Sequence, residues 1–136
     1  VTQLSINSNS DILDVLYGYL LLLMKLYKKQ ITSGSSFNFG PSKSSNKSVN
    51  KVVNLMNKNF QNCVKIINQK NRKKNFKESK VLLLNSNKSK KLLKWKSKYN
   101  LVKSVKLTSV WFEKFIDKKN KNILEVTQNQ IRDYFN

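Results

Sequence analysis

The sequence predicts a mixed α/β fold in which helices dominate. Apolar residues recur at helical spacing in several stretches, whereas three short runs have the composition of strands. At 136 residues the chain is long enough for one domain with a modest core, and its 10% aromatic content argues against disorder. We therefore expect an irregular lead-in over residues 1–11 and one folded region over residues 12–136.

The first half of the chain is expected to hold two helices with a short strand between them. A helix should begin at Asp11, because the apolar residues that follow keep helical spacing and its last turn is basic. These apolar residues are Ile12, Val15, Leu16, Tyr19, Leu23 and Leu26. Residues 35–40 are predicted to form a strand, since Phe37 and Phe39 alternate there. A second amphipathic helix is indicated by Val49, Val52, Val53, Met56 and Phe60.

Two further strands are expected in the middle of the chain. Residues 63–67 and 80–84 are apolar runs of strand length, and a polar, basic loop over residues 68–79 separates them. After the second run, Ser86 or Asn87 is expected to cap a short helix.

The last third of the chain is expected to be helical. Asn100 has the position of a cap for a long helix. The inner face of this helix is predicted to carry Leu101, Val105, Thr108, Phe112 and Phe115. Thr127 and Gln130 have the spacing of a capping box, which predicts the start of a final helix running through Tyr134.

The charge of the chain is strongly unbalanced. Lys and Arg total 27 against seven acidic residues, which gives a formal charge of +20 and normally points to nucleic acid or an anionic membrane. Codon drift in an AT-rich genome is the other account, because Asn occurs 19 times and the only arginines are Arg72 and Arg132. We favour drift, since a nucleic-acid reader is expected to use arginine for two-pronged contacts.

The residue inventory excludes several kinds of site. A single cysteine, Cys63, cannot form an internal disulfide, so a cytoplasmic location is the default. The sequence contains no histidine, which removes a Ser-His-Asp triad and most zinc sites. Residues 15–24 are apolar but too short to span a bilayer, and no secretory signal is visible. We therefore expect no metal and no membrane partner.

Six short motifs follow one another along the chain. They are residues 14–22 (DVLYGYLLL), 37–41 (FNFGP), 77–78 (KE), 85–90 (NSNKSK), 93–99 (LKWKSKY) and 125–134 (EVTQNQIRDY). Their order resembles the carboxyl-terminal part of the extended short-chain dehydrogenase/reductase family, where the matching motifs read S-G-Y-L-L-L, W-N-F-G-P, H-E, D-C-S-K-A-K, L-G-W-x-P-R-W and E-F-T-x-x-Q-I-x-x-Y. Within this family of nucleotide-sugar epimerases and dehydratases, the T-x-x-Q-I element favours the CDP-glucose 4,6-dehydratase branch.

The resemblance implies a fold and a chemistry. In the intact family, bound NAD takes a hydride from C4 of CDP-glucose, water leaves across C5 and C6, and the hydride returns to C6. The product, CDP-4-keto-6-deoxyglucose, serves surface-polysaccharide synthesis, and the enzyme is a homodimer. The part represented here would be the last strand of the Rossmann sheet and the lid that covers the nucleotide sugar. It would depend on a Rossmann half that this sequence does not contain.

The departures from the family motifs imply that the chain is inactive alone. Residues 7–11 (NSNSD) stand where the family has R-P-W-Q-H, and asparagine cannot supply the charged fork of that arginine. Nothing in the sequence matches the family's Gly-x-x-Gly-x-x-Gly loop. We therefore expect no catalytic residue and no NAD-binding residue in this chain.

Three residues are predicted to contact substrate on the strength of the resemblance. Asn38 lies in the W-N-F-G-P motif, although an asparagine that closes a turn explains it equally well. Lys77 and Glu78 occupy the H-E position, where a solvated loop is the alternative. The basic residues of the 68–79 loop are suited to holding a diphosphate. Trp95 and Trp111 are expected to anchor the core.

Two other classes of function stay open. A small nucleic-acid-binding module would stack bases on Trp95, Tyr99, Trp111 and Phe112 among lysines, and we expect such binding to be weak and confined to low salt. The chain would otherwise be the product of a truncated gene, without a stable fold. Without a Rossmann half, uncovered apolar faces predict marginal solubility.

Overall fold

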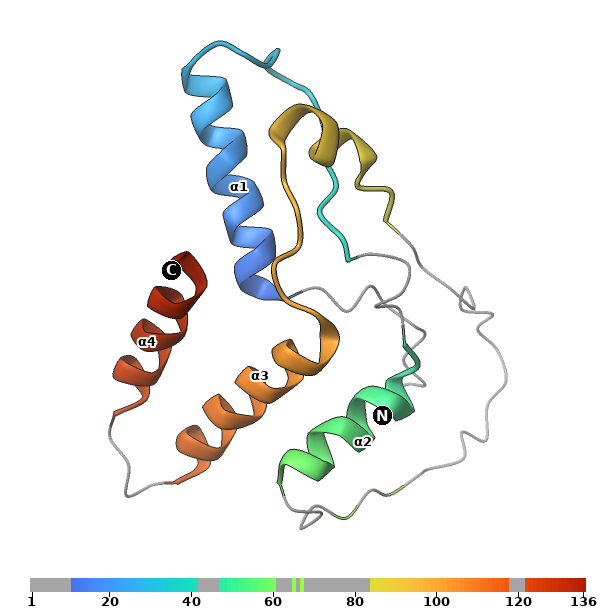
Figure 1. Ribbon diagram of the computed structural model, residues 1–136, viewed down its shortest axis with the longest axis vertical. Coiled ribbons are helices and arrows are strands. Elements are labelled where there is room, and N and C mark those ends of the chain that lie inside the picture. Colours follow the sequence, from blue (N-terminus) through green and yellow to red (C-terminus); the bar gives the residue numbers. More distant parts are fainter. Residues whose placement is uncertain (1–10, 42–46, 61–64, 66, 68–83, 118–121) are drawn as a thin grey trace.

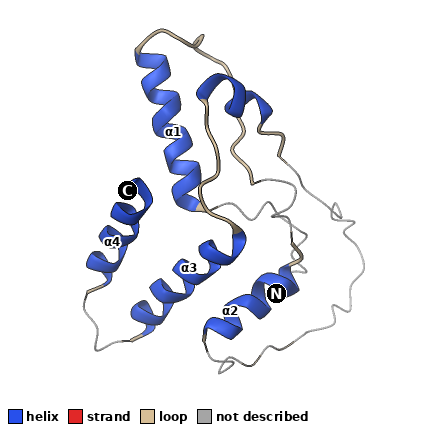
Figure 2. Cartoon of the chain, viewed as in Figure 1, coloured by secondary structure: helices blue, strands red, loops and turns tan. Residues whose placement is uncertain are grey.

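The computed structural model describes residues 11–41, 47–60, 65, 67, 84–117 and 122–136 (Figure 1). Its elements are α1 (Ile12–Tyr27), α2 (Val49–Asn59), the π-helical turn η2 (Ser89–Leu93), α3 (Leu101–Ile116) and α4 (Ile123–Phe135). Over these described residues the chain is helix-dominant, as expected, and Figure 2 shows helices and loops without a strand.

Helix α1 begins where the sequence predicts. The Asp11 side chain caps it by accepting a hydrogen bond from the Leu13 amide at 2.9 Å. One side of α1 packs on η2, which lies beside it in Figure 1. Gly18 permits the close approach of Phe39 to the same helix, because a Cβ atom there would lie 2.4 Å from the Phe39 ring.

The strand predicted over residues 35–40 is wrong, because the described residues offer no strand beside it. Main-chain groups of this segment bond instead to two hydroxyls. The Ser86 hydroxyl accepts from the Gly40 amide at 2.9 Å and donates to the Gly40 carbonyl, while Ser89 donates to the Asn38 carbonyl at 2.5 Å. Phe39 is buried and Phe37 is half-buried against the core, so the alternation of these two rings reflects packing without a strand.

Helices α2, α3 and α4 pack in chain order in space, with α3 between the other two (Figure 1). Asn100 caps α3 as predicted, accepting from the Lys103 amide at 2.9 Å. The predicted inner face is confirmed at Leu101 and Val105, which are buried. It is wrong at Thr108, Phe112 and Phe115, which are exposed, because α3 turns Ser109 toward α2 instead.

The predicted start of the last helix is also wrong. Helix α4 begins at Ile123, so Thr127 lies in its second turn rather than at its cap. Thr127 and Gln130 face α3 instead. The Trp111 indole donates to the Thr127 hydroxyl at 3.0 Å, and Gln130 donates to the Leu107 carbonyl at 3.0 Å. The spacing of Thr127 and Gln130 therefore places both side chains against α3 and does not mark a helix start.

Several predicted features lie outside the described residues. These are the lead-in up to residue 10, most of the 63–67 run with Cys63, the 68–79 loop and residues 80–83. Leu84, the last residue of the 80–84 run, is described and lies in no strand.

The short helix predicted after residue 86 is confirmed as η2, but neither expected cap residue acts as expected. The Ser86 hydroxyl is engaged with Gly40, and Asn87 donates its amide to the Asn85 side chain. The turn ends at Lys94, whose φ of 58° is left-handed. This reversal directs the next residue, Trp95, into the core.

Lys94→Gly is expected to stabilise the chain by about 1 kcal/mol, because a side chain in the left-handed region is strained and glycine is not. Chemical denaturation followed by circular dichroism measures the change. Lys96→Gly is the matched control, since φ at Lys96 is not positive and glycine there gains nothing. Equal effects of the two substitutions would contradict the prediction.

Candidate functional site

The described residues close around one buried carboxylate, that of Asp14 in α1. Its side chain is only 1% exposed. Oδ1 accepts hydrogen bonds from the Lys98 amide at 2.8 Å and from the Tyr134 hydroxyl at 2.7 Å. Oδ2 accepts from the Ser97 hydroxyl at 2.6 Å and from the Tyr99 amide at 3.4 Å. These five residues are called the Asp14 cluster below.

Aromatic rings wall off this cluster from solvent. The indole of Trp95 is 1% exposed and donates to the main-chain carbonyl of Asp14 at 2.8 Å. The Phe39 ring meets Trp95 edge to face, with 5.3 Å between centroids. Tyr99 and Tyr134 meet in the same way at 5.2 Å. The prediction that Trp95 anchors the core is therefore confirmed.

Both tyrosines of the cluster are held in their neutral form. Burial, followed by the hydrogen bond to Asp14, raises the pKa of Tyr134 well above its ordinary value of about 10. Burial and the nearby carboxylates of Asp11, Asp133 and Asp14 raise the pKa of Tyr99 in the same direction. A phenol that stays protonated acts as a hydrogen-bond donor, which is the role of Tyr134 here.

The geometry of the cluster indicates a structural role, in which Asp14 holds residues 97–99 and Tyr134 against α1. Each oxygen of Asp14 already accepts from two donors, which fills the positions that a metal ion or a substrate hydroxyl would need. The sequence analysis did not single out Asp14. The signal was present, because a lone carboxylate four residues before Gly18 shares its helix face and interrupts an apolar run.

Only one of the three predicted substrate-binding residues has a described position. The Asn38 side chain is exposed, and its main-chain carbonyl is held by Ser89. Lys77 and Glu78 lie outside the described residues. The substrate-binding role of these three residues therefore stays a prediction.

The second predicted anchor, Trp111, is half-buried and joins two helices. Its ring stacks on Phe115, with 5.0 Å between centroids and 13° between planes, and its indole donates to Thr127 in α4. The lysine run of residues 88–98 is mostly a solvated face, with Lys90, Lys91, Lys94 and Lys96 exposed. At its start, Lys88 lies 4.6 Å from the centroid of the Phe37 ring.

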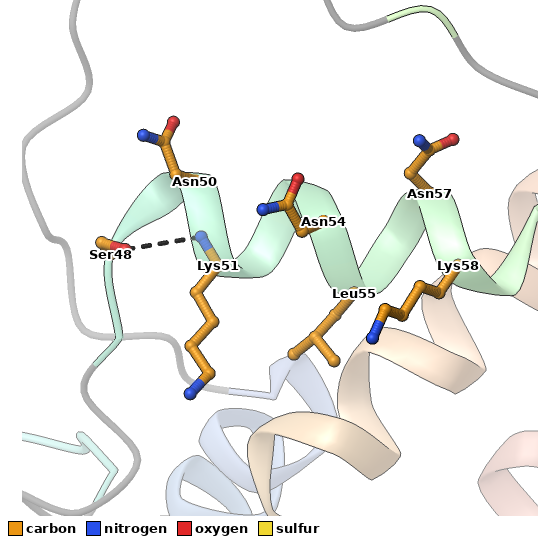
Figure 3. Close-up of a pocket in the computed structure, with 7 residues that line it drawn as sticks. All are labelled: Ser48, Asn50, Lys51, Asn54, Leu55, Asn57 and Lys58. Carbon is orange, nitrogen blue, oxygen red and sulfur yellow. Dashed lines mark hydrogen bonds between the residues drawn. The ribbon is translucent and has the colours of Figure 1, made fainter. Parts of the chain in front are cut away.

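A shallow hollow runs along α2. It is lined by Ser48, Asn50, Lys51, Asn54, Leu55, Asn57 and Lys58. Figure 3 shows three of these, Asn50, Asn54 and Asn57, on one side of the helix, and Lys51, Leu55 and Lys58 on the other. All seven belong to one helix and its cap, so a ligand in the hollow would be contacted from one side only.

Two other features are absent from the described part of the chain. No group of three or more His, Cys, Asp or Glu side chains is gathered there as a metal ion would need. Within the same residues, no helix combines the length and the hydropathy that crossing a bilayer requires.

Asp14→Asn is expected to lower the free energy of unfolding by about 2–3 kcal/mol, because an amide nitrogen would face donors that now bond a buried carboxylate. Urea denaturation followed by circular dichroism measures the loss. Asp133→Asn makes the same chemical change at an exposed position of α4 and is expected to cost less than about 0.5 kcal/mol. The prediction fails if both variants lose stability equally.

The stability of the chain is expected to fall as the pH rises above about 10, the ordinary pKa of tyrosine. Tyr134 ionises there in the unfolded chain, whereas its raised pKa keeps it neutral in the folded chain, so its contribution is complete below pH 10 and declines above it. Lysines titrate in the same range, so the measured quantity is the difference between the wild type and Tyr134→Phe. A difference that does not change between pH 8 and pH 11 would refute this account.

Comparison with known proteins assigns no family to the chain. No protein-family model matches it, and no curated protein or solved structure matches it either. The case for a function therefore rests on the contacts of the residues described above.

Proposed function

We propose that this chain is the carboxyl-terminal, substrate-covering region of a CDP-glucose 4,6-dehydratase-like enzyme of the cytoplasm. A Rossmann half, which these 136 residues do not include, would bind NAD and carry the catalytic residues. One observation carries the proposal: residues from five motifs that resemble this family meet in one cluster, although the motifs lie far apart in the sequence.

The contacts between the motifs are specific. Asp14 and Gly18 of residues 14–22 meet, respectively, Trp95 of residues 93–99 and Phe39 of residues 37–41. Ser89 of residues 85–90 bonds the main chain of residues 37–41. Tyr134 of residues 125–134 bonds Asp14. If the motifs matched only by chance, because of the unusual composition of the sequence, they would not be expected to pack on one another.

The conformation of Lys94 supports the same proposal. The family motif L-G-W has glycine at this position, and Lys94 has the left-handed φ of 58° that glycine adopts most readily. Gly18 stands at the glycine of S-G-Y-L-L-L, where the Phe39 ring leaves no room for a side chain. At both positions the backbone suits the residue of the family motif.

The proposal divides the work between two parts. In this chain, Asn38 and the basic loop with Lys77 and Glu78 would contact the CDP-sugar. The hydroxyls of Ser86 and Ser89 form hydrogen bonds with main-chain groups of Gly40 and Asn38. The main-chain groups of Phe37 and Phe39 are not part of these bonds. Because alternate residues of an extended segment present these groups to opposite edges, the second edge would pair with the sheet of the Rossmann half.

The test is to mix the full chain with a CDP-glucose 4,6-dehydratase truncated before the same motifs. We expect a stable complex on size-exclusion chromatography, and NAD-dependent conversion of CDP-glucose that neither piece shows alone. Asn38→Ala is expected to raise KM about tenfold, equivalent to about 1.4 kcal/mol of lost binding, while leaving the complex intact.

Ser36→Ala is the matched control, because Ser36 is an exposed neighbour on the same segment. It is expected to leave both the complex and KM unchanged. A chain that is helical by circular dichroism, yet neither associates with the truncated enzyme nor restores turnover, would refute the proposal.

A further inference from the structure

Helix α1 presents its apolar side outward. Its inner side holds Asp14 and Gly18, which are buried, while large apolar residues face away from the rest of the chain. The exposed apolar residues of this outer face are Ile12, Leu16, Leu20, Leu23, Met24 and Tyr27. Tyr19 is also exposed but lies at the edge of the face, where its ring meets that of Phe39 edge to face. A helix that meets water on its outer side normally carries polar residues there. The outer face of α1 therefore suits an apolar surface.

The charges at the two ends of this outer face differ: the half-exposed Asp11 caps the amino-terminal end, and lysines follow the carboxyl-terminal end. No acidic or basic residue interrupts it between Ile12 and Met24, since Asp14 points inward and is 1% exposed. Lys28 and Lys29 are exposed directly beyond its carboxyl-terminal end. The whole chain carries a formal charge of +20, so a second copy would meet it with strong repulsion. A partner surface with an apolar interior and a negatively charged border would match both the apolar face of α1 and the lysines beside it.

We propose that the outer face of α1 docks on an anionic lipid bilayer. The helix has 16 residues and a length of about 24 Å at about 1.5 Å per residue, so it lies in the plane of the interface rather than crossing it. Its leucines reach the acyl boundary, and Tyr27 takes the headgroup level that amphipathic rings favour. Lys28 and Lys29 lie against the lipid phosphates.

This inference does not rest on the dehydratase proposal, because it uses residues outside the Asp14 cluster and outside the predicted substrate site. Leu16 and Leu23 are 46% and 61% exposed, so their replacement leaves the core intact. The binding surface and the fold are therefore separable by mutation.

The experiment is co-sedimentation of the full chain with vesicles of phosphatidylcholine alone or of phosphatidylcholine mixed with phosphatidylserine. We expect binding to the mixed vesicles, and at least about tenfold weaker binding to the neutral ones. The double variant Leu16→Glu, Leu23→Glu is expected to bind the mixed vesicles at least about tenfold more weakly. The matched control Thr32→Glu, Ser36→Glu changes the charge equally at exposed loop positions and should bind within about threefold of the wild type.

A second variant, Lys28→Gln with Lys29→Gln, leaves the apolar face intact and is expected to weaken binding to mixed vesicles about tenfold. Circular dichroism checks that every variant keeps its helices. Three results would overturn the proposal: no binding of the wild type to mixed vesicles, equal loss in the Glu control, or a dimer in analytical ultracentrifugation that only the leucine variant breaks. The last result would assign the face to a second copy.

Discussion

The Asp14 carboxylate decides how the parts of this chain meet. It lies in α1, while its donors lie in residues 97–99 and at Tyr134, which is 120 positions further along the chain. Bringing such distant segments together costs chain entropy, and burying a carboxylate without hydrogen-bond partners destabilises the folded state. Docking of α4 and docking of residues 97–99 are therefore coupled, because Asp14 stays buried only when both are in place.

The apolar core beside this carboxylate is small. In the described part of the chain, the buried apolar side chains are Phe39, Leu93, Trp95, Leu101, Val105 and Tyr134. Because burial of apolar area is the main stabilising contribution in most domains, a core of this size leaves little margin. The hydrogen bonds that Tyr134 and Trp95 donate to Asp14 therefore contribute more to the preference for this arrangement over other compact conformations.

Local patterns predicted the helices well, whereas contacts between distant segments were beyond them. The cap at Asn100 and the start of α1 at Asp11 were predicted because both depend on nearby residues: each of these side chains bonds an amide two or three residues away. The 35–40 strand was wrong because a strand depends on a neighbour, which no local pattern specifies. Thr127 was misread for the same reason, since its partner Trp111 lies in another helix. Asp14 gave a local signal, but its donors could be identified only in three dimensions.

The distribution of lysine bears on both the drift account and the outer face of α1. Lysine makes up 25 of the 136 residues, yet residues 1–24 contain none, so the lysine-free stretch covers most of α1 and the residues before it. Drift has no preference for one side of a helix, whereas α1 turns Asp14 inward and its exposed leucines outward. The lysines beyond Met24 attract phosphates as point charges and lack the fork with which arginine reads bases. Composition explains why lysine outnumbers arginine, whereas the gathering of exposed leucines on one side of α1, ahead of Lys25, is what the proposed apolar contact explains.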